Sequence, residues 1–240
     1  SGQDALVETP LQSRNELSRE IGVEFVHSES DCLSEIIAAA NRGKCVVWVR
    51  NSVDDACRAF QQVQEQIANK EHCMLFHSRF VLGHRKATEN TVLDWFGKES
   101  SQAERAGKVL IATQVFQESI DADLDMMISD ICPIDDLIQR SGRLMRHTRN
   151  EQGEYQKGIE ECRGEPKLFV HAPIWQAEPE ADWLLKNFRN TQAVYRSPGK
   201  LWLGMEKLRE LGRIKMPDNA RELIEYVYGE QVVDRIPENL

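Results

Sequence analysis

Four arginines recur at every third position near the middle of the 240-residue chain, as Arg140, Arg143, Arg146 and Arg149. A guanidinium stays charged and offers two parallel donors that match the oxygens of a phosphate. Wound as a helix at about 100° per residue, this stretch places Gln139, Arg143 and Arg146 on one narrow face. An isolated run of arginines would more simply be a solvated basic face. The order Gln-Arg-x-Gly-Arg-x-x-Arg favours a polyphosphate site instead.

The same stretch predicts one helix from Ile134 to Arg149. Pro133 suits a first helical turn, and two acids directly after it complement the positive end of the helix dipole. Gly142 leaves room for a ligand to approach the backbone. The opposite side of the predicted helix is apolar and would anchor it, through Ile134, Leu137, Ile138, Leu144 and Met145.

A second polar stretch directly follows the apolar run Val109–Ala112, which is typical of a buried strand. It begins with Thr113 and Gln114 and reaches Asp121, whose carboxylate could accept hydrogen bonds from ribose hydroxyls. The acids at 121, 123 and 125 also suggest a calcium loop. That alternative has little support, because the stretch has neither the glycine of the sharp turn nor a bidentate glutamate at the required spacing.

Two more polar clusters follow apolar runs, and they contain Asn51-Ser52 and Ser78-Arg79. Ligands of open parallel sheets bind at the carboxyl ends of the strands, so we expect both clusters to line one edge with Thr113 and Gln114. Hydroxyl, amide and guanidinium groups, with backbone N–H groups at helix starts, bind sugar-phosphate backbones. Each serine alone could simply cap a helix. Three clusters at one edge favour a nucleic-acid groove.

Alternation of strands and helices predicts the fold class, an α/β domain with a doubly wound parallel sheet covered by helices on both faces. Strands are expected at 23–27, 45–49, 73–76, 109–112, 126–131 and 167–171. Helices are expected at 31–42, 51–68 and 82–96, and polar loops at 98–107 and 152–166.

The chain divides into three parts on the same pattern. Residues 1–20 are predicted to be a linker or cloning remnant, residues 21–172 the α/β domain, and residues 173–240 a small, mainly helical C-terminal extension. The helices of the extension are expected at 183–188, 201–211 and 217–228, with no strands between them.

Composition limits the classes of protein that fit. Hydrophobic residues make up 41% and charged residues 29%, which is ordinary for a soluble protein. The apolar runs are too short to span a membrane, so no membrane partner is expected. Six cysteines without metal-ligand spacing indicate reduced, mostly buried thiols in the cytoplasm, and no metal site is predicted. A net charge of −9 argues against bulk attraction to nucleic acid but allows a local basic groove.

The ordered motifs resemble those of superfamily 2 helicases. The segment from Ala112 to Asp121 resembles motif V, and the segment from Gln139 to His147 resembles motif VI. Asn51-Ser52-Val53 is similar to motif IV, and Phe76-His77-Ser78-Arg79-Phe80 to the motif after it. The run Ser-Ile-Asp-Ala-Asp-Leu-Asp, Pro133-Ile134-Asp135 and the ending Arg-His resemble, more narrowly, the CRISPR-associated nuclease-helicase of type I systems.

The tail supports the narrower resemblance through Tyr195, Leu201-Trp202, Leu208, Pro217, Arg221, Glu225 and Val227-Tyr228-Gly229. Two positions depart from the family pattern. An acid and then an amide would be expected before Ser119, whereas Gln117 precedes Glu118 here. Met145 stands where a histidine is common.

The resemblance implies a RecA-like second motor lobe and a role for each matching residue. Arg143 and Arg146 would be arginine fingers that stabilise charge on the transferring γ-phosphoryl group of ATP. Gln139 and Gly142 would lie beside the same nucleotide, and Asp121 would contact the ribose or couple nucleotide to strand. The phosphates of single-stranded DNA would be held by Thr113, Gln114, Asn51, Ser52, Ser78 and Arg79.

Other motor parts are absent from the sequence. It has no G-x-x-x-x-G-K-[ST] stretch, no acidic D-E-x-x box and no adjacent His-Asp pair for a metal nuclease. We therefore expect ATP and Mg²⁺ to be bound mainly by a first lobe, and this chain alone to be inactive.

The resemblance implies a whole enzyme that moves along single-stranded DNA while degrading it in type I CRISPR antiviral defence. Its partners would be a first lobe, a nuclease domain and an RNA-guided surveillance complex. Two alternatives stay open: a lobe of another superfamily 2 DNA or RNA helicase, or a non-enzymatic nucleic-acid-binding module.

Overall fold

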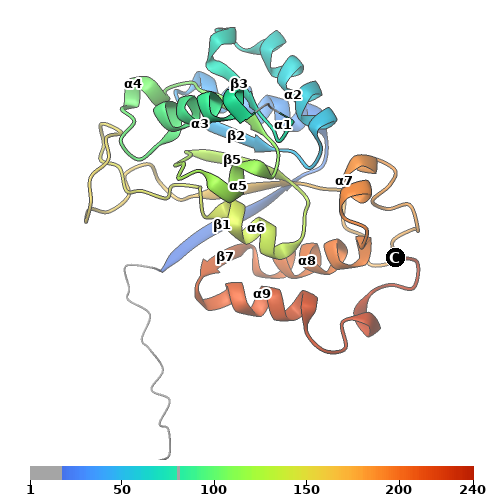
Figure 1. The fold of residues 1–240 in the computed structure, drawn as a ribbon. Coiled ribbons are helices and arrows are strands. Elements are labelled where there is room, and N and C mark those ends of the chain that lie inside the picture. Colours follow the sequence, from blue (N-terminus) through green and yellow to red (C-terminus); the bar gives the residue numbers. More distant parts are fainter. Residues whose placement is uncertain (1–17, 80–81) are drawn as a thin grey trace, which may run out of the picture.

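A seven-stranded sheet forms the centre of the computed structural model, which describes residues 18–79 and 82–240 (Figure 1). Its strand order is β3-β4-β2-β5-β6-β1-β7, and neighbouring strands are parallel except β1 and β7. The predicted doubly wound α/β fold is confirmed. The strands are β1 (Arg19–Val26), β2 (Val46–Val49), β3 (Cys73–Phe76), β4 (Val109–Ala112), β5 (Met126–Asp130), β6 (Lys167–His171) and β7 (Arg213–Met216).

Helices connect the strands and cover both faces of the sheet. Serine side chains cap three of them at the N-terminus, where Ser28, Ser52 and Ser101 accept hydrogen bonds from backbone N–H groups. The helices are α1 (Glu29–Asn41), α2 (Val53–Gln66), α3 (Leu82–Phe96), α4 (Gln102–Arg105), α5 (Val115–Ser119), α6 (Ile134–Ser141), α7 (Arg189–Val194), α8 (Pro198–Leu211) and α9 (Asp218–Tyr228), with 3-10 turns at Lys70–His72 and Val233–Arg235.

The period of two along the strands creates two hydrophobic cores. In β2, Val46 and Trp48 pack with α1 and α2, whereas Val47 and Val49 belong to the core on the other face. Helices α8 and α9 lie on that second face, on the opposite side of the sheet from α1 and α2 (Figure 1). All four β2 residues are fully buried, which explains the continuous apolar run in the sequence.

The C-terminal part contains a strand that the sequence did not predict. Strand β7 (Arg213–Met216) pairs antiparallel with β1 at the edge of the sheet. The expectation of no strands after residue 173 is therefore wrong, because four residues with one buried side chain, Ile214, give too weak an alternation. The division at residue 173 stays a prediction. Residues on both sides of it, such as Leu168 and Leu201, share one core.

Several further boundaries differ from the prediction. Residues 183–188 form turns rather than a helix, and the regular helix is α7, directly after them. The expected polar loop at 98–107 contains α4, which has a capping box between Ser101 and Glu104. The predicted linker lies mostly outside the described residues, and Arg19 and Glu20 at its end already belong to β1. No described helix has both the length and the apolar character needed to cross a membrane.

Candidate nucleotide and nucleic-acid site

The predicted helix from Ile134 to Arg149 is only half as long in the structure. Helix α6 ends at Ser141, and Gly142 is its C-cap. The chain then leaves the helix to pair with the loop before β5: Leu124 N–H donates to Arg143 O (2.9 Å), and Met145 N–H donates to Leu124 O (2.8 Å). This pairing buries Leu144 completely. The sequence predicted an apolar anchor, and the structure contains one. Part of it comes from the β-bridge between Leu144 and Leu124 instead of from a helix face.

The four arginines separate into two pairs of different kinds. Arg140 and Arg149 are fully buried. Arg140 donates to Gln117 Oε1 (2.7 Å), and Arg149 donates to Asp123 Oδ2 (2.7 Å). These two side chains therefore have a structural role, because each joins this segment to the stretch that follows β4. Arg143 is half-buried and Arg146 is exposed, so the two predicted phosphate-binding arginines are the two that reach the surface.

Arg143 is tethered to the polar stretch that follows β4. Its Nε donates to Ile120 O (2.8 Å) and its Nη2 to Gln117 O (2.9 Å). Within the described part of the chain, its Nη1 makes no hydrogen bond and can face a ligand. Burial and the nearby charge of Arg146 lower the pKa of Arg143, but a guanidinium stays charged. Two neighbouring cations, for which Asp121 supplies the nearby carboxylate, form a site that would attract an anion.

Asp121 holds the second arginine. Arg146 Nε lies 2.7 Å from Asp121 Oδ1, and His147 Nε2 lies 3.3 Å from the same oxygen. Both partners of the ion pair are solvent-accessible, with side-chain exposures of 40% and 54%. Such an exposed pair is weak, so a phosphate can compete for Arg146. Gln139 is also exposed, and its Oε1 lies 3.5 Å from Gln117 Nε2.

Gly142 has an ordinary right-handed helical conformation with φ −62°. A Cβ atom at this position would meet Gln139 O at 3.2 Å, which is a tight contact. The glycine therefore lets the chain turn closely against the end of α6. Its predicted place beside the nucleotide stays a prediction.

The three polar clusters lie at one edge of the sheet, as predicted. Strands β2, β3 and β4 end in register, because Ala112 pairs with both Val49 and Phe76. Two backbone bonds continue this alignment past the strands: Thr113 N–H donates to Phe76 O (3.1 Å), and Arg50 N–H donates to Ala112 O (2.7 Å). The residues that follow each strand are thus brought together.

Accessibility differs among the predicted DNA-binding residues. Ser78 and Arg79 are exposed, and the one ion pair of Arg79 with a described residue is a long 3.7 Å contact with Asp54. His77 Nδ1 accepts the backbone N–H of Arg79 (3.1 Å), and burial with the charge of Arg79 lowers the His77 pKa, which favours this acceptor. Ser52 caps α2. Thr113 is 3% exposed, whereas Gln114 is half-buried.

Asn51 lies inside the protein, at 1% exposure. Its Nδ2 donates to Ile131 O (2.7 Å) and Thr191 Oγ1 (3.0 Å), and its Oδ1 accepts from Arg140 (3.2 Å). The side chain connects the end of β2 with α6 and α7. Its predicted contact with DNA can therefore only be indirect in this conformation, through the position of the loop it holds.

Gln117 is a central residue that the sequence reasoning missed. At 7% exposure, its Oε1 accepts from Arg140 and its Nε2 donates to Asp136 Oδ1 (2.7 Å). An amide can donate and accept at the same time, which an ionised carboxylate cannot. This gives a physical reason for the departure at Gln117-Glu118 from the order expected in the family. Asp136 also accepts from the hydroxyl of Tyr195 (3.4 Å).

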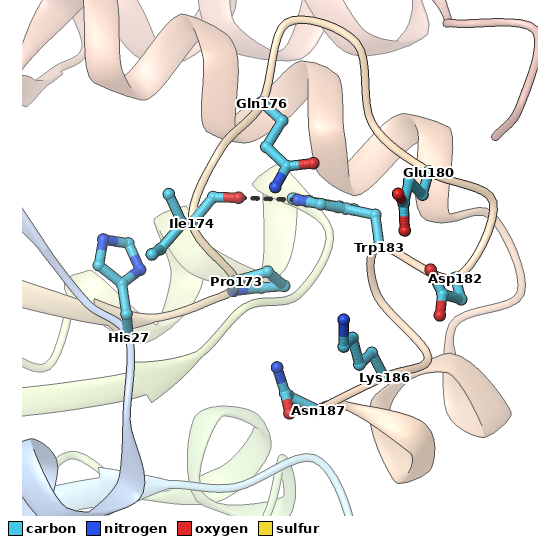
Figure 2. Close-up of a pocket in the computed structure, with 9 residues that line it drawn as sticks. All are labelled: His27, Pro173, Ile174, Gln176, Glu180, Asp182, Trp183, Lys186 and Asn187. Carbon is cyan, nitrogen blue, oxygen red and sulfur yellow. Dashed lines mark hydrogen bonds between the residues drawn. The ribbon is translucent and has the colours of Figure 1, made fainter.

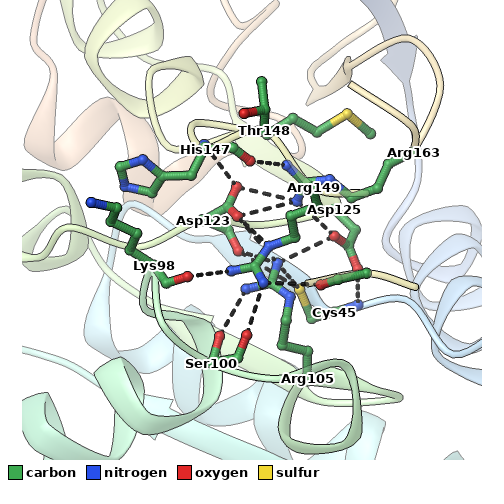
Figure 3. A network of polar contacts seen from close by, with 12 residues as sticks. Cys45, Lys98, Ser100, Arg105, Asp123, Asp125, His147, Thr148, Arg149 and Arg163 are labelled. Carbon is green, nitrogen blue, oxygen red and sulfur yellow. Dashed lines mark hydrogen bonds and ion pairs between the residues drawn. The ribbon is translucent and has the colours of Figure 1, made fainter. Parts of the chain in front are cut away.

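The remaining acids of the stretch belong to a buried ion network (Figure 3). Asp123 is fully buried and lies close to Arg105, Arg149 and Arg163. Asp125 binds Arg105 (3.2 Å) and Arg163 (3.0 Å). Arginines occupy the oxygens that a calcium loop would need. No group of three or more His, Cys, Asp or Glu side chains in the described ranges could hold a metal.

A hollow of about 230 Å³ lies farther along the same edge, beside the ends of β1 and β6 (Figure 2). His27 and Pro173 line it with Trp183, whose Nε1 donates to Ile174 O (2.9 Å). The carboxylates of Glu180 and Asp182 outnumber the one lysine in its lining, Lys186, so the hollow would not favour a phosphate backbone. The hollow is therefore not included in the nucleic-acid edge.

Comparisons with known proteins agree with this arrangement. Residues 42–149 match the family model described as CRISPR-associated nuclease/helicase Cas3, C-terminal. A Cas3 endonuclease/helicase of Escherichia coli K12 is 31% identical over 207 residues, which are 84% of this chain and 21% of that protein. A Cas3 of Streptococcus thermophilus is 44% identical over 163 residues, 68% of this chain and 15% of that protein. The solved structure of T. fusca Cas3 with AMPPNP superposes with a TM-score of 0.74 at 26% identity, over 96% of this chain and 26% of that one.

The fold, the arginine turn and the polar strand edge define the second motor lobe of a superfamily 2 helicase. The chain belongs to the Cas3 family, as the C-terminal helicase lobe of a type I nuclease-helicase.

Proposed function

We propose that the chain is the second motor lobe of an ATP-dependent enzyme that translocates along single-stranded DNA and degrades it in type I CRISPR defence. One observation carries the proposal: the turn with Arg143 and Arg146 is tethered to the stretch that begins at the polar strand edge. The chain spans about a fifth of the length of the E. coli relative, so the activity of the whole enzyme is inferred from its family.

The nucleotide would be ATP with Mg²⁺, bound mainly by a first lobe. ATP supplies the γ-phosphoryl group, on which negative charge must be stabilised during transfer. The accessible guanidiniums of Arg143 and Arg146 fit that task, and Gln139 is exposed beside them. Fixed donors are effective because they need no reorganisation at the moment of reaction. The two backbone carbonyls bound to Arg143 fix the direction of its side chain.

Coupling between nucleotide and DNA would run through one short segment. Thr113 lies at the strand edge, and α5 follows it. Asp121, eight residues after Thr113, pairs with Arg146. Phosphate binding at Arg146 would release Asp121 to a ribose or to a new conformation of the segment. The DNA phosphates would contact Ser78, Arg79 and the backbone near Thr113.

The partners of the enzyme would be single-stranded DNA, the first lobe and nuclease domain of the same protein, and an RNA-guided surveillance complex. These assignments rest on membership of the Cas3 family. With these partners, the activity would be in the cytoplasm.

The arginine pair is tested in the full-length enzyme by Arg143→Ala. We expect DNA-stimulated ATP hydrolysis to fall by roughly 10³-fold, the lower end of the range for an arginine finger. Single-strand binding should be nearly unchanged, because Arg143 lies at the nucleotide and not at the DNA edge. Arg221→Ala is the matched control, since this arginine is exposed on α9 and pairs only with Glu225 among the described residues. Equal activity of the two variants would contradict the proposal.

The chain alone should bind ATP weakly and hydrolyse none, because it lacks a phosphate-binding loop and the acidic box. An ATPase assay with and without single-stranded DNA measures this directly. The first lobe added in trans is the positive control. DNA-stimulated ATP hydrolysis by the 240-residue chain on its own would contradict the two-lobe assignment.

A further inference from the structure

The turn that carries the arginine pair has an unusual support from the first strand. Arg19, the first residue of β1, sends its guanidinium to the backbone carbonyls of Gly142 (3.4 Å), Leu144 and Met145 (3.2 Å). These partners are separated from it by more than 120 residues in sequence. They are the carbonyls between and beside Arg143 and Arg146.

The chemistry of Arg19 indicates a dedicated clamp. Its side chain is partly buried, and burial together with the charges of Arg146 and Arg163 lowers its pKa. In the described chain it forms no ion pair with an acid. A desolvated cation without a carboxylate partner is costly unless its hydrogen bonds are satisfied, and here they are satisfied by carbonyls. The planar fork of a guanidinium can reach several carbonyls at once, which an ammonium cannot do with the same geometry.

The turn itself needs such support. Met145 has a φ of 45°, in the left-handed region that non-glycine residues rarely adopt, and Arg146 follows it directly. Strained backbone of this kind persists only when the surroundings hold it in place. The bridge to Leu124 holds the turn from one side. Arg19 holds it through the carbonyls that the bridge leaves open.

We propose that Arg19 is a positioning residue for the arginine pair, which fixes the Gly142–Met145 turn so that Arg143 and Arg146 meet the nucleotide with a defined geometry. This inference rests on the proposed function of the pair. Arg19 itself touches no substrate. Its loss would let the turn relax from its strained conformation and displace the guanidiniums, and a displacement of about 1 Å can cost on the order of 10²-fold in rate.

The kinetic test uses Arg19→Ala, Arg19→Lys and Arg213→Ala in the full-length enzyme. Arg213 is the matched control, because it pairs with Glu20 on the adjacent strand and does not contact the turn. Arg19→Ala should lower kcat for ATP by roughly 10- to 100-fold with little change in KM or in single-strand binding. Arg19→Lys should be intermediate. An Arg19→Ala enzyme as fast as the Arg213→Ala enzyme would overturn the proposal.

A second measurement does not depend on activity. Hydrogen exchange on the 240-residue chain should show faster exchange of the Leu124 and Met145 amides in Arg19→Ala, with the central β2 amides unchanged. If Arg19→Ala does not fold, Arg19→Lys replaces it in both measurements, and unchanged exchange at both amides in a folded variant rejects the clamp. If Arg143→Ala leaves ATP hydrolysis intact while exchange at the turn responds, the proposed function fails and the structural role of Arg19 stands.

Discussion

At the scale of single residues, accessibility decides which of the predicted groups can meet DNA. Arg79 is the most exposed cation at the polar edge, with a side-chain exposure of 70% and no close ion pair among the described residues. Asn51, which follows β2 at the same edge, is of an equally suitable type but is buried. Residue type alone could not separate the two, because their partners come from distant segments.

The change Arg79→Ala should weaken single-strand binding by the assembled enzyme about equally for all sequences and reduce its salt slope by about 1, since a phosphate contact releases a counterion. Titrations at several salt concentrations measure both effects. Arg209→Ala on α8 is the control, because that arginine lies over Trp175. Unchanged affinity and slope would remove Arg79 from the DNA edge.

At the scale of elements, the contact between α5 and α6 depends on one amide. Gln117 connects the buried cation Arg140 to the carboxylate of Asp136. In Gln117→Glu a second carboxylate would face Asp136 at close range, which is unfavourable even though Arg140 gains a charged partner. We expect Gln117→Glu to destabilise the chain, Asp136→Asn to be milder, and the double variant to recover part of the loss.

A double-mutant cycle from urea unfolding at pH 7 measures this interaction. The coupling free energy should favour the double variant by about 0.5–3 kcal/mol, the range for residues that share one hydrogen-bond network. The control is a second cycle that combines Glu118→Gln with Asp136→Asn, because the Glu118 side chain is exposed. Additive effects at 117 and 136 would show that the amide bridge is unimportant.

The element scale also shows what the sequence can and cannot predict. Strands β3, β4 and β6 and helix α3 have their predicted bounds, because their apolar runs and flanking residues agree with the tertiary structure. Helix α6 ends eight residues early, since pairing of Leu144 with Leu124 replaces a helical continuation that local pattern favours. Arg143 and Arg146 were predicted as site residues from their order in the chain. Arg19 and Gln117 were not, because the Arg19 bonds to backbone carbonyls and the Gln117 bonds to the Arg140 and Asp136 side chains join separate segments and leave no local pattern.

At the scale of the whole molecule, buried carboxylates connect the sheet with its flanking helices. Asp130 at the end of β5 binds Arg50 (2.8 Å) and His171 (2.9 Å). Burial alone would raise its pKa, but Arg50 and His171 outweigh that effect and hold the pKa of Asp130 well below its usual range. The pKa of Asp125 is also lowered, because Arg105 and further donors outweigh burial.

These lowered pKa values predict acid sensitivity. A carboxylate that ionises more easily in the folded state stabilises the fold above its unfolded pKa of about 3.9, and the stabilisation is lost as pH falls below that value. The free energy of unfolding should therefore begin to fall as pH drops below about 5, and it should keep falling below pH 3, toward the lowered folded pKa values of these carboxyls. Urea unfolding at several pH values measures the slope. Asp130→Asn should cost about 3–5 kcal/mol at pH 7, because Arg50 loses a buried partner, and should flatten the acid slope. A slope unchanged by this variant would contradict the assignment.

The Gln117 bridge has a consequence for the history of the family. The N–H of an amide at 117 needs an acceptor at 136, whereas an acid at 117 would be repelled by a negative charge at 136. Neither position can drift alone without loss of stability, so the two should be inherited together. Among homologous lobes, an acid at the first position should accompany an uncharged residue at the second. The departure from the family order is then one half of a compensated pair of substitutions.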